Sequence, residues 1–149
     1  MSRAGFSSIE KSTHKTKEWL HEIQGELGWE DENMVYIASR AVLQTLRDRL
    51  PVVEAVELAD GLPMVMKGMY YDGYKPTGKP EKIKNREEFF QKVQEKTSRR
   101  PIESEEATRA VFHILDKKLG GGGEINQVKG NLPKDLQRLW KASESEVRK

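Results

Sequence analysis

Apolar residues and threonines recur along this chain at the spacing of helices. Near the N-terminus they step by three and four residues, at Ile9, Thr13, Thr16, Leu20, Ile23 and Leu27. Steps of this size place side chains on one face of an α-helix. A broader apolar face extends from Met34 to Leu50, and shorter helical stretches follow Pro51 and Pro63. Because no stretch alternates apolar and polar residues with a period of two, the pattern predicts an all-α fold.

The segment 38–50 recurs later in the chain as 107–119. The two segments share Ala, Arg, Ala, Val, Leu and Leu at matching positions, so Leu46 and Leu115 are predicted to be equivalent core residues. Such a recurrence indicates an internal duplication. We expect a four-helix unit (long, long, short, short) that occurs twice and packs as one pseudo-symmetric helical domain. Its parts are copy one at 8–71, a linker at 72–84, copy two at 85–142, and flexible ends at 1–6 and 143–149.

Polar residues and glycines predict where these helices begin and end. Ser7 with Glu10, and Asn85 with Glu88, have the three-residue spacing of a capping box at a helix start. Gly61 is predicted to end a short helix in the left-handed conformation that glycine adopts without strain. The run Gly120–Gly123 is predicted to be a flexible connector, because it lacks the Gly-Lys-Ser/Thr of a phosphate-binding loop.

Composition narrows the class of protein further. The 149 residues are 36% hydrophobic and 34% charged, which suits one folded domain with a sizeable core. Cysteine is absent, which excludes disulfides and thiolate metal sites. The first residues show no apolar run typical of a signal peptide, and no run of eighteen apolar residues occurs, so we expect a cytoplasmic protein without a membrane-spanning segment.

Charge is distributed unevenly between the two parts of the chain. Residues 1–66 carry 7 basic and 11 acidic side chains, and residues 67–149 carry 19 and 13. This asymmetry favours self-association or attraction of a polyanion. The segment 67–86 combines six basic and two acidic residues with three tyrosines. It supports an alternative function, weak and sequence-independent binding of nucleic acid.

The segment from Met64 to Tyr74 is rich in methionine and tyrosine, whereas its counterpart in the second copy is not. Aromatic side chains flanked by charge are typical of protein interfaces. Our candidate partner-binding residues are Lys67, Tyr70, Tyr71, Tyr74 and Lys75, and we expect at least one of the three rings to be substantially exposed. The other interpretation is that these side chains close the core beneath the linker.

The sequence contains few residues in arrangements suited to metal binding or catalysis. Glu18 and His21 have the Glu-x-x-His spacing of di-iron bundles, and His14 precedes them, but no second such motif occurs. All three lie opposite the apolar face, so we expect a solvated surface and no metal or other cofactor. No catalytic arrangement of Ser, His and Asp can be assembled either. The leading interpretation is a non-enzymatic helical interaction module that binds a protein partner or a second copy of itself.

The motifs of this chain resemble those of the bacterial domain-of-unknown-function family 2267. The resemblance rests on Leu46–Pro51, Leu62-Pro63, Gly68–Gly73 with Pro76, Arg86–Phe89, Gly123–Val128 and Leu132–Trp140. It covers about Trp19 to Trp140, most of the chain. The resemblance implies a helical fold and supplies no assigned reaction.

Overall fold

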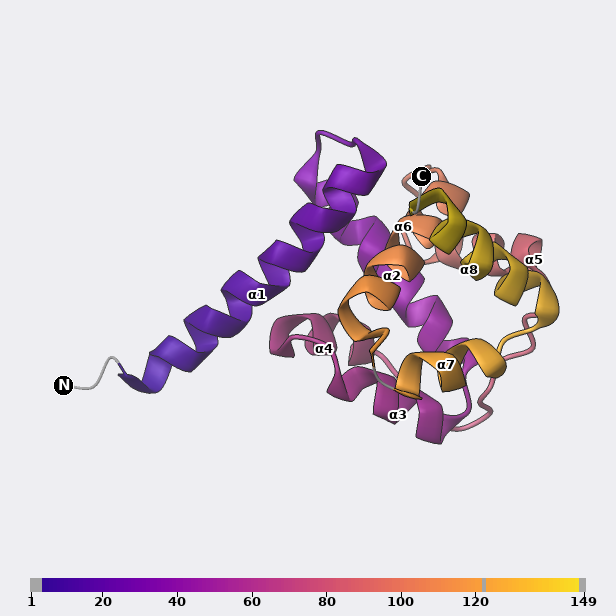
Figure 1. Cartoon of the computed structure of the whole chain (residues 1–149), viewed down its shortest axis with the longest axis horizontal. Coiled ribbons are helices and arrows are strands. Elements are labelled where there is room, and N and C mark those ends of the chain that lie inside the picture. The colour runs from indigo at the N-terminus through magenta and orange to yellow at the C-terminus, as the bar shows by residue number, and fades with distance from the viewer. Residues whose placement is uncertain (1–3, 122, 148–149) are drawn as a thin grey trace.

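The computed structural model describes residues 4–121 and 123–147, with the side chains of 5–121 and 123–141. Within these ranges the chain forms eight α-helices and no strand (Figure 1), which confirms the all-α prediction. In chain order they are α1 (Ala4–Leu27), α2 (Glu32–Arg49), α3 (Val52–Asp60), α4 (Met64–Tyr71), α5 (Arg86–Glu95), α6 (Ser104–Leu119), α7 (Gly123–Gly130) and α8 (Lys134–Val147).

Helices α2 and α6 form the centre of the molecule. α6 packs against α1, α2, α5, α7 and α8, and α2 also contacts α1, α4 and α5. α3 packs against α7 from the other half of the chain. One hydrophobic cluster contains buried residues from all eight of these helices. The two halves of the chain therefore share one core, instead of each enclosing its own.

The predicted core positions of the two central helices are confirmed. Leu46 of α2 is 0% exposed and Leu115 of α6 is 2% exposed. Beside them, the ring of Phe112 stacks on Trp140 with centroids 4.1 Å apart and meets Phe89 edge to face at 5.9 Å. Because such pairs add stability beyond the area they bury, these contacts join α5, α6 and α8 firmly.

Side-chain caps account for the starts of α2 and α5. The carboxylate of Asp31 accepts hydrogen bonds from the backbone N–H groups of Asn33 and Met34, at 2.9 and 3.3 Å. The predicted cap at Asn85 is confirmed, since its side-chain oxygen accepts from the N–H of Glu88 at 2.9 Å. These bonds satisfy N–H groups that have no partner within their own helix.

Several helix boundaries differ from the prediction. α1 begins at Ala4, so Ser7 lies inside the helix instead of capping it, and residues 4–6 are helical. α8 continues to Val147 instead of ending at 142, because the sequence there contains no glycine or proline to stop it. The order long, long, short, short fits α1–α4, but α5 has 10 residues and α8 has 14.

The role of Gly61 also differs from the prediction. Its φ is −84°, which is an ordinary right-handed conformation. A Cβ at this position would lie 2.8 Å from a methyl carbon of Leu119 in α6. The Leu119 side chain thus lies close to Gly61, and a larger residue here would displace the end of that side chain.

Charged residues interrupt every long helix of the fold. In the part of the chain that the structure describes, no helix is long and apolar enough to cross a membrane.

Candidate functional site

The predicted partner-binding residues lie on α4 and in the loop that follows it. Lys67 is half-buried on α4, and Lys75 is exposed in the loop. Tyr70 is completely buried, and its hydroxyl donates a hydrogen bond to the backbone oxygen of Ala55 at 2.7 Å. Burial raises the pKa of the Tyr70 hydroxyl far above its usual value of 10. Tyr70 is therefore a core residue, which corrects its predicted place in a partner-binding surface.

Tyr71 and Tyr74 lie between the core and the surface. Both are half-buried and pack against the hydrophobic core, and their ring centroids are 6.2 Å apart. Partial burial raises the pKa of both hydroxyls. The hydroxyl of Tyr74 is enclosed and has no hydrogen-bond partner in the described part of the chain. The expected substantially exposed ring stays a prediction: Tyr70 is buried, while Tyr71 and Tyr74 are half-buried and pack on one another beside it.

A buried ion pair holds this segment in place. Arg47 and Asp48 are each 3% exposed, and the Nε and Nη2 atoms of Arg47 both lie 2.8 Å from Oδ1 of Asp48. The Nη1 atom of Arg47 donates to the backbone oxygens of Tyr70 at 2.8 Å and Asp72 at 3.0 Å. The guanidinium also lies 5.0 Å from the ring centroid of Tyr74. Arg47 thus fastens the end of α4 to α2, a role that sequence analysis missed.

The predicted linker at 72–84 is also fastened to the body of the molecule. The N–H of Glu81 donates to the backbone oxygen of Asp48 at 2.8 Å, and Nε of Arg49 donates to the backbone oxygen of Ile83 at 3.0 Å. Ile83 itself is 1% exposed. This segment therefore packs as a part of the fold and carries one of its core side chains.

The exposed apolar residues gather elsewhere. The outer faces of α3 and α4 carry a group that we call the α3/α4 surface: Val52, Val53, Val56, Met64 and Val65, between 36% and 67% exposed. Gly68 is also exposed on α4, and a Cβ added there would meet nothing within 4 Å. Exposed apolar groups of this kind mark interaction sites more often than isolated exposed residues do.

A second apolar group lies on the N-terminal part of α1. We call residues 4–15 the α1 arm, and in Figure 1 this part of the helix projects away from the rest of the molecule. Phe6 and Ile9 are 67% and 56% exposed. They share one helical face with Thr16 and Ile23, which are 3% and 2% exposed. One apolar face thus begins in solvent and continues into the core.

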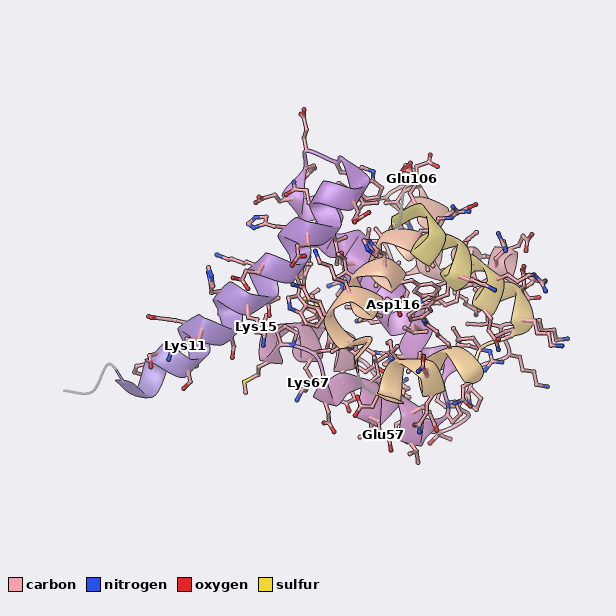
Figure 2. All side chains as sticks on the ribbon, in the orientation of Figure 1. Lys11, Lys15, Glu57, Lys67, Glu106 and Asp116 are labelled. Atoms are coloured by element: carbon pink, nitrogen blue, oxygen red, sulfur yellow. The ribbon has the colours of Figure 1, made fainter. Side chains whose placement is uncertain are left out.

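The α1 arm and the α3/α4 surface carry opposite charges. Between residues 4 and 15 the chain has Lys11 and Lys15 against the single acid Glu10. Between residues 52 and 71 it has three acids, Glu54, Glu57 and Asp60, and one base, Lys67. Figure 2 places Lys11 and Lys15 on the projecting helix and Glu57 on the lower part of the globular body.

The histidines of α1 lie on its solvated face, as predicted. His14 lies 3.2 Å from Glu18, and His21 lies 3.2 Å from Glu32, with all four side chains more than half exposed. Within the residues that the structure describes, no three His, Cys, Asp or Glu side chains are grouped as metal ligands would be. Several ion pairs join helices instead, such as Lys117 and Lys118 of α6 with Glu22 of α1.

These observations define an all-helical protein with a shared core and two exposed apolar faces. The chain belongs to the family described as "Uncharacterized conserved protein (DUF2267)", whose match covers residues 16–139. No curated protein gives a significant match to the sequence.

Proposed function

We propose that this protein is a helical interaction module whose partner is a second copy of the same chain. In this proposal the α1 arm of one copy packs on the α3/α4 surface of the other. The observation that carries the proposal is the apolar face of α1, which is buried at Thr16 and Ile23 but exposed at Ile9 and Phe6. An intramolecular partner covers only the second part of this face, and a second copy covers the rest.

The α3/α4 surface has the properties of the receiving site. Val53 and Val56 of α3 and Met64 and Val65 of α4 present exposed apolar side chains. Gly68 costs α4 helical stability of about 1 kcal/mol relative to alanine, and no internal contact requires it. A glycine on an exposed helix face allows the backbone of another helix to approach closely.

Charge favours this pairing over the contact of two arms. Residues 4–15 carry a net charge of +1 and residues 52–71 a net charge of −2. Two basic arms repel each other, whereas an arm and an acidic α3/α4 surface attract. Because each copy has one arm and one surface, two copies satisfy both through a two-fold axis, which is the commonest symmetry of oligomers.

The alternative function, nucleic-acid binding through residues 67–86, has less support. Lys79 of this segment pairs with Glu81 at 3.3 Å, and Arg86 pairs with Asp135 at 3.0 Å. These two cations are already neutralised within the chain. The tyrosine rings of the segment, which would stack on bases, are buried or half-buried.

We also infer that the two halves of the chain are copies of one helical unit. The inference is supported by the equivalent residues of α2 and α6, since Leu46 and Leu115 are both buried, as are Val42 and Val111. The halves have nevertheless diverged at their first helices, α1 with 24 residues and α5 with 10. The extra length of α1 supplies the arm that the second half lacks.

Sedimentation velocity over a range of concentrations tests the self-association. We expect the wild type to sediment as a dimer and both Ile9→Lys and Val53→Lys to sediment as monomers. Each variant introduces a charge into an apolar contact that the proposal buries. Since Ile9 and Val53 are exposed in the monomer, neither change should disturb folding, which circular dichroism checks.

Ser8→Lys is the matched control. Ser8 is exposed on the same helix as Ile9 but lies off its apolar face, so this variant should remain dimeric. A wild type that stays monomeric at high concentration contradicts the proposal. A dimer that survives both Ile9→Lys and Val53→Lys contradicts it equally.

A further inference from the structure

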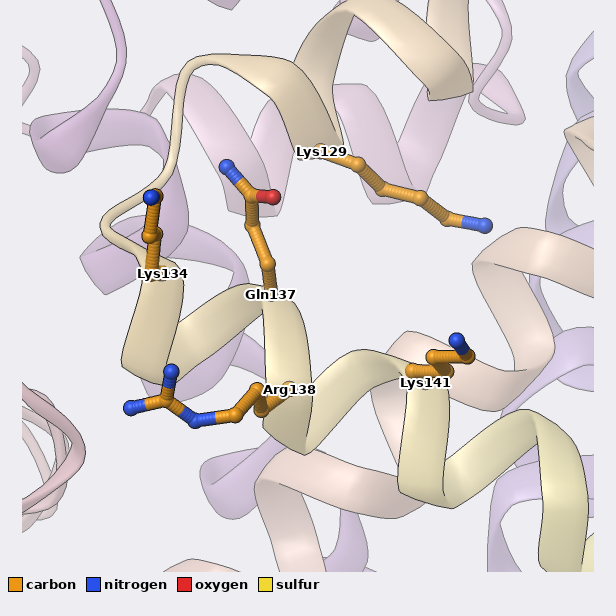
Figure 3. A pocket seen from close by; sticks show the side chains of 5 residues that line it. All are labelled: Lys129, Lys134, Gln137, Arg138 and Lys141. Carbon is orange, nitrogen blue, oxygen red and sulfur yellow. The ribbon is translucent and has the colours of Figure 1, made fainter.

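Basic side chains surround a cavity on the side of the molecule formed by α7 and α8. The cavity has a volume of about 410 Å³ and is lined by Lys129, Lys134, Gln137, Arg138 and Lys141 (Figure 3). Four of these five residues are cationic and none is acidic. This volume lies within the range of small-molecule sites, roughly 300–1,000 Å³.

The sequence of α8 arranges these residues on one face. Lys134, Gln137, Arg138 and Lys141 stand at positions i, i+3, i+4 and i+7 of the helix. Lys129 reaches the cavity from α7. In Figure 3 the amino groups of Lys129 and Lys141 lie at one end of the cavity, and Lys134 and Arg138 lie at the other.

Two lysines of the cavity are available for a ligand. Lys129 is already held by Asp116 at 2.9 Å, and Arg138 lies 3.7 Å from Asp135. Lys134 and Lys141 are exposed and have no acidic partner among the side chains that the structure describes. Lys134 is moreover the first residue of α8, where the helix dipole adds positive potential.

Asp116 and Asp135 already lie beside Lys129 and Arg138, so the positive charge that a ligand could balance is mainly that of Lys134 and Lys141. Lys134 and Arg138 are like charges four residues apart on a helix, and such a pair is destabilising. Elsewhere the fold places acids beside its bases, as with Glu22, whose carboxylate lies between Lys117 and Lys118. A multiply charged anion would relieve the repulsion in the cavity in the same way.

We propose that the basic cavity between α7 and α8 binds the phosphate chain of a small phosphorylated compound. Phosphate oxygens accept charge-assisted hydrogen bonds from ammonium and guanidinium groups. A di- or triphosphate chain carries several negative charges close together and can thus contact more than one of these cations. This inference does not depend on self-association, because the cavity lies on α7 and α8 and the α1 arm and α3/α4 surface do not contribute to it.

Isothermal titration calorimetry of the full chain with inorganic triphosphate and with ATP tests the proposal. We expect both compounds to bind with a Kd on the order of 10–100 µM at low ionic strength. The double variant Lys134→Gln/Lys141→Gln should weaken binding by roughly tenfold or more, because it removes the two cations without acidic partners. Tighter binding of ATP identifies a nucleotide as the ligand, and equal binding identifies the phosphate chain alone.

The double variant Lys82→Gln/Lys84→Gln is the matched control. It removes the same charge from two exposed lysines in the loop before α5 and should leave the Kd unchanged within about twofold. No binding by the wild type at millimolar ligand overturns the proposal, as does an equal loss in the control variant. A short single-stranded oligonucleotide that binds more than tenfold tighter than triphosphate also overturns it, in favour of a nucleic acid.

Discussion

Asp48 is a buried residue that contacts three parts of the chain. Its carboxylate pairs with Arg47 at 2.8 Å and with Lys96, just after α5, at 3.2 Å, while its backbone oxygen accepts from the N–H of Glu81. Both carboxylate contacts involve cations, and the side chain of Arg47 is only 4% exposed. Arg47 would therefore be left as a buried charge without its counter-ion if the carboxylate were removed.

We predict that Asp48→Ala lowers the free energy of unfolding by about 3–5 kcal/mol, the cost of breaking a buried ion pair from one side. Chemical denaturation followed by circular dichroism measures this change. Asp72→Ala serves as the control, since that side chain is exposed and should change stability by less than about 0.5 kcal/mol. A loss below about 1 kcal/mol for Asp48→Ala would mean that Arg47 does not need this partner.

Residue-scale roles were the hardest to predict from the sequence. The same composition of tyrosine, methionine and lysine suits an interface and a closed core, and only packing decides between them. Tyr70 can be buried because its hydroxyl donates a hydrogen bond to the backbone oxygen of Ala55, which is fifteen residues away in the sequence. Arg47 and Asp48 are adjacent opposite charges on a helix, a pattern more typical of solvated surfaces.

At the scale of elements, hydrogen bonds and an ion pair between Arg86 and Asp135 join the N-termini of α5 and α8. The carboxylate of Asp135 accepts from the backbone N–H of Arg86 at 2.7 Å and from its Nε at 3.0 Å. The backbone N–H, the guanidinium of Arg86 and the nearby Arg138 hold the pKa of Asp135 below its usual value of 3.8. A carboxyl group whose pKa is lowered by folding stabilises the fold only while it is ionised.

Asp135→Asn should therefore destabilise the protein at neutral pH. The difference in unfolding free energy between wild type and variant should be constant well above pH 3.8 and disappear as the pH falls through the lower pKa of the folded state. Urea denaturation at several pH values measures it. Glu87→Gln, at an exposed position of α5, should show no such trend. A difference that persists unchanged at low pH would contradict the role given to the charge.

The sequence predicted which helices exist, but it did not predict where each helix ends or which helices pack against it. Helical spacing and the cap at Asn85 predicted α5 correctly, because both signals are local. The start of α1 was misplaced because Ser7 is a good capping residue that lies within a longer helix. The basic cavity has a signal in the spacing of Lys134, Arg138 and Lys141 on α8. It becomes a cavity only when α7 brings Lys129 beside them.

At the scale of the whole molecule, the fold leaves the α1 arm and the α3/α4 surface uncovered. The shared core of the two halves could be anticipated from the recurrent apolar pattern of α2 and α6. The projection of the α1 arm could not, since the sequence does not reveal where the covering helices end. The sequence places Ile9 on the same helical face as Leu20 and Ile23, whereas the structure leaves Ile9 56% exposed.

Disulfide formation between two different copies tests the proposed packing of the α1 arm on the α3/α4 surface most directly. Because the chain has no cysteine, Ile9→Cys and Val56→Cys each introduce a single thiol. When the two variants are mixed and mildly oxidised, we predict a disulfide-linked dimer that joins the arm of one copy to the α3/α4 surface of the other. Ser8→Cys with Val56→Cys is the control, with its thiol off the apolar face. A yield of linked dimer no higher than that of the control would contradict the account.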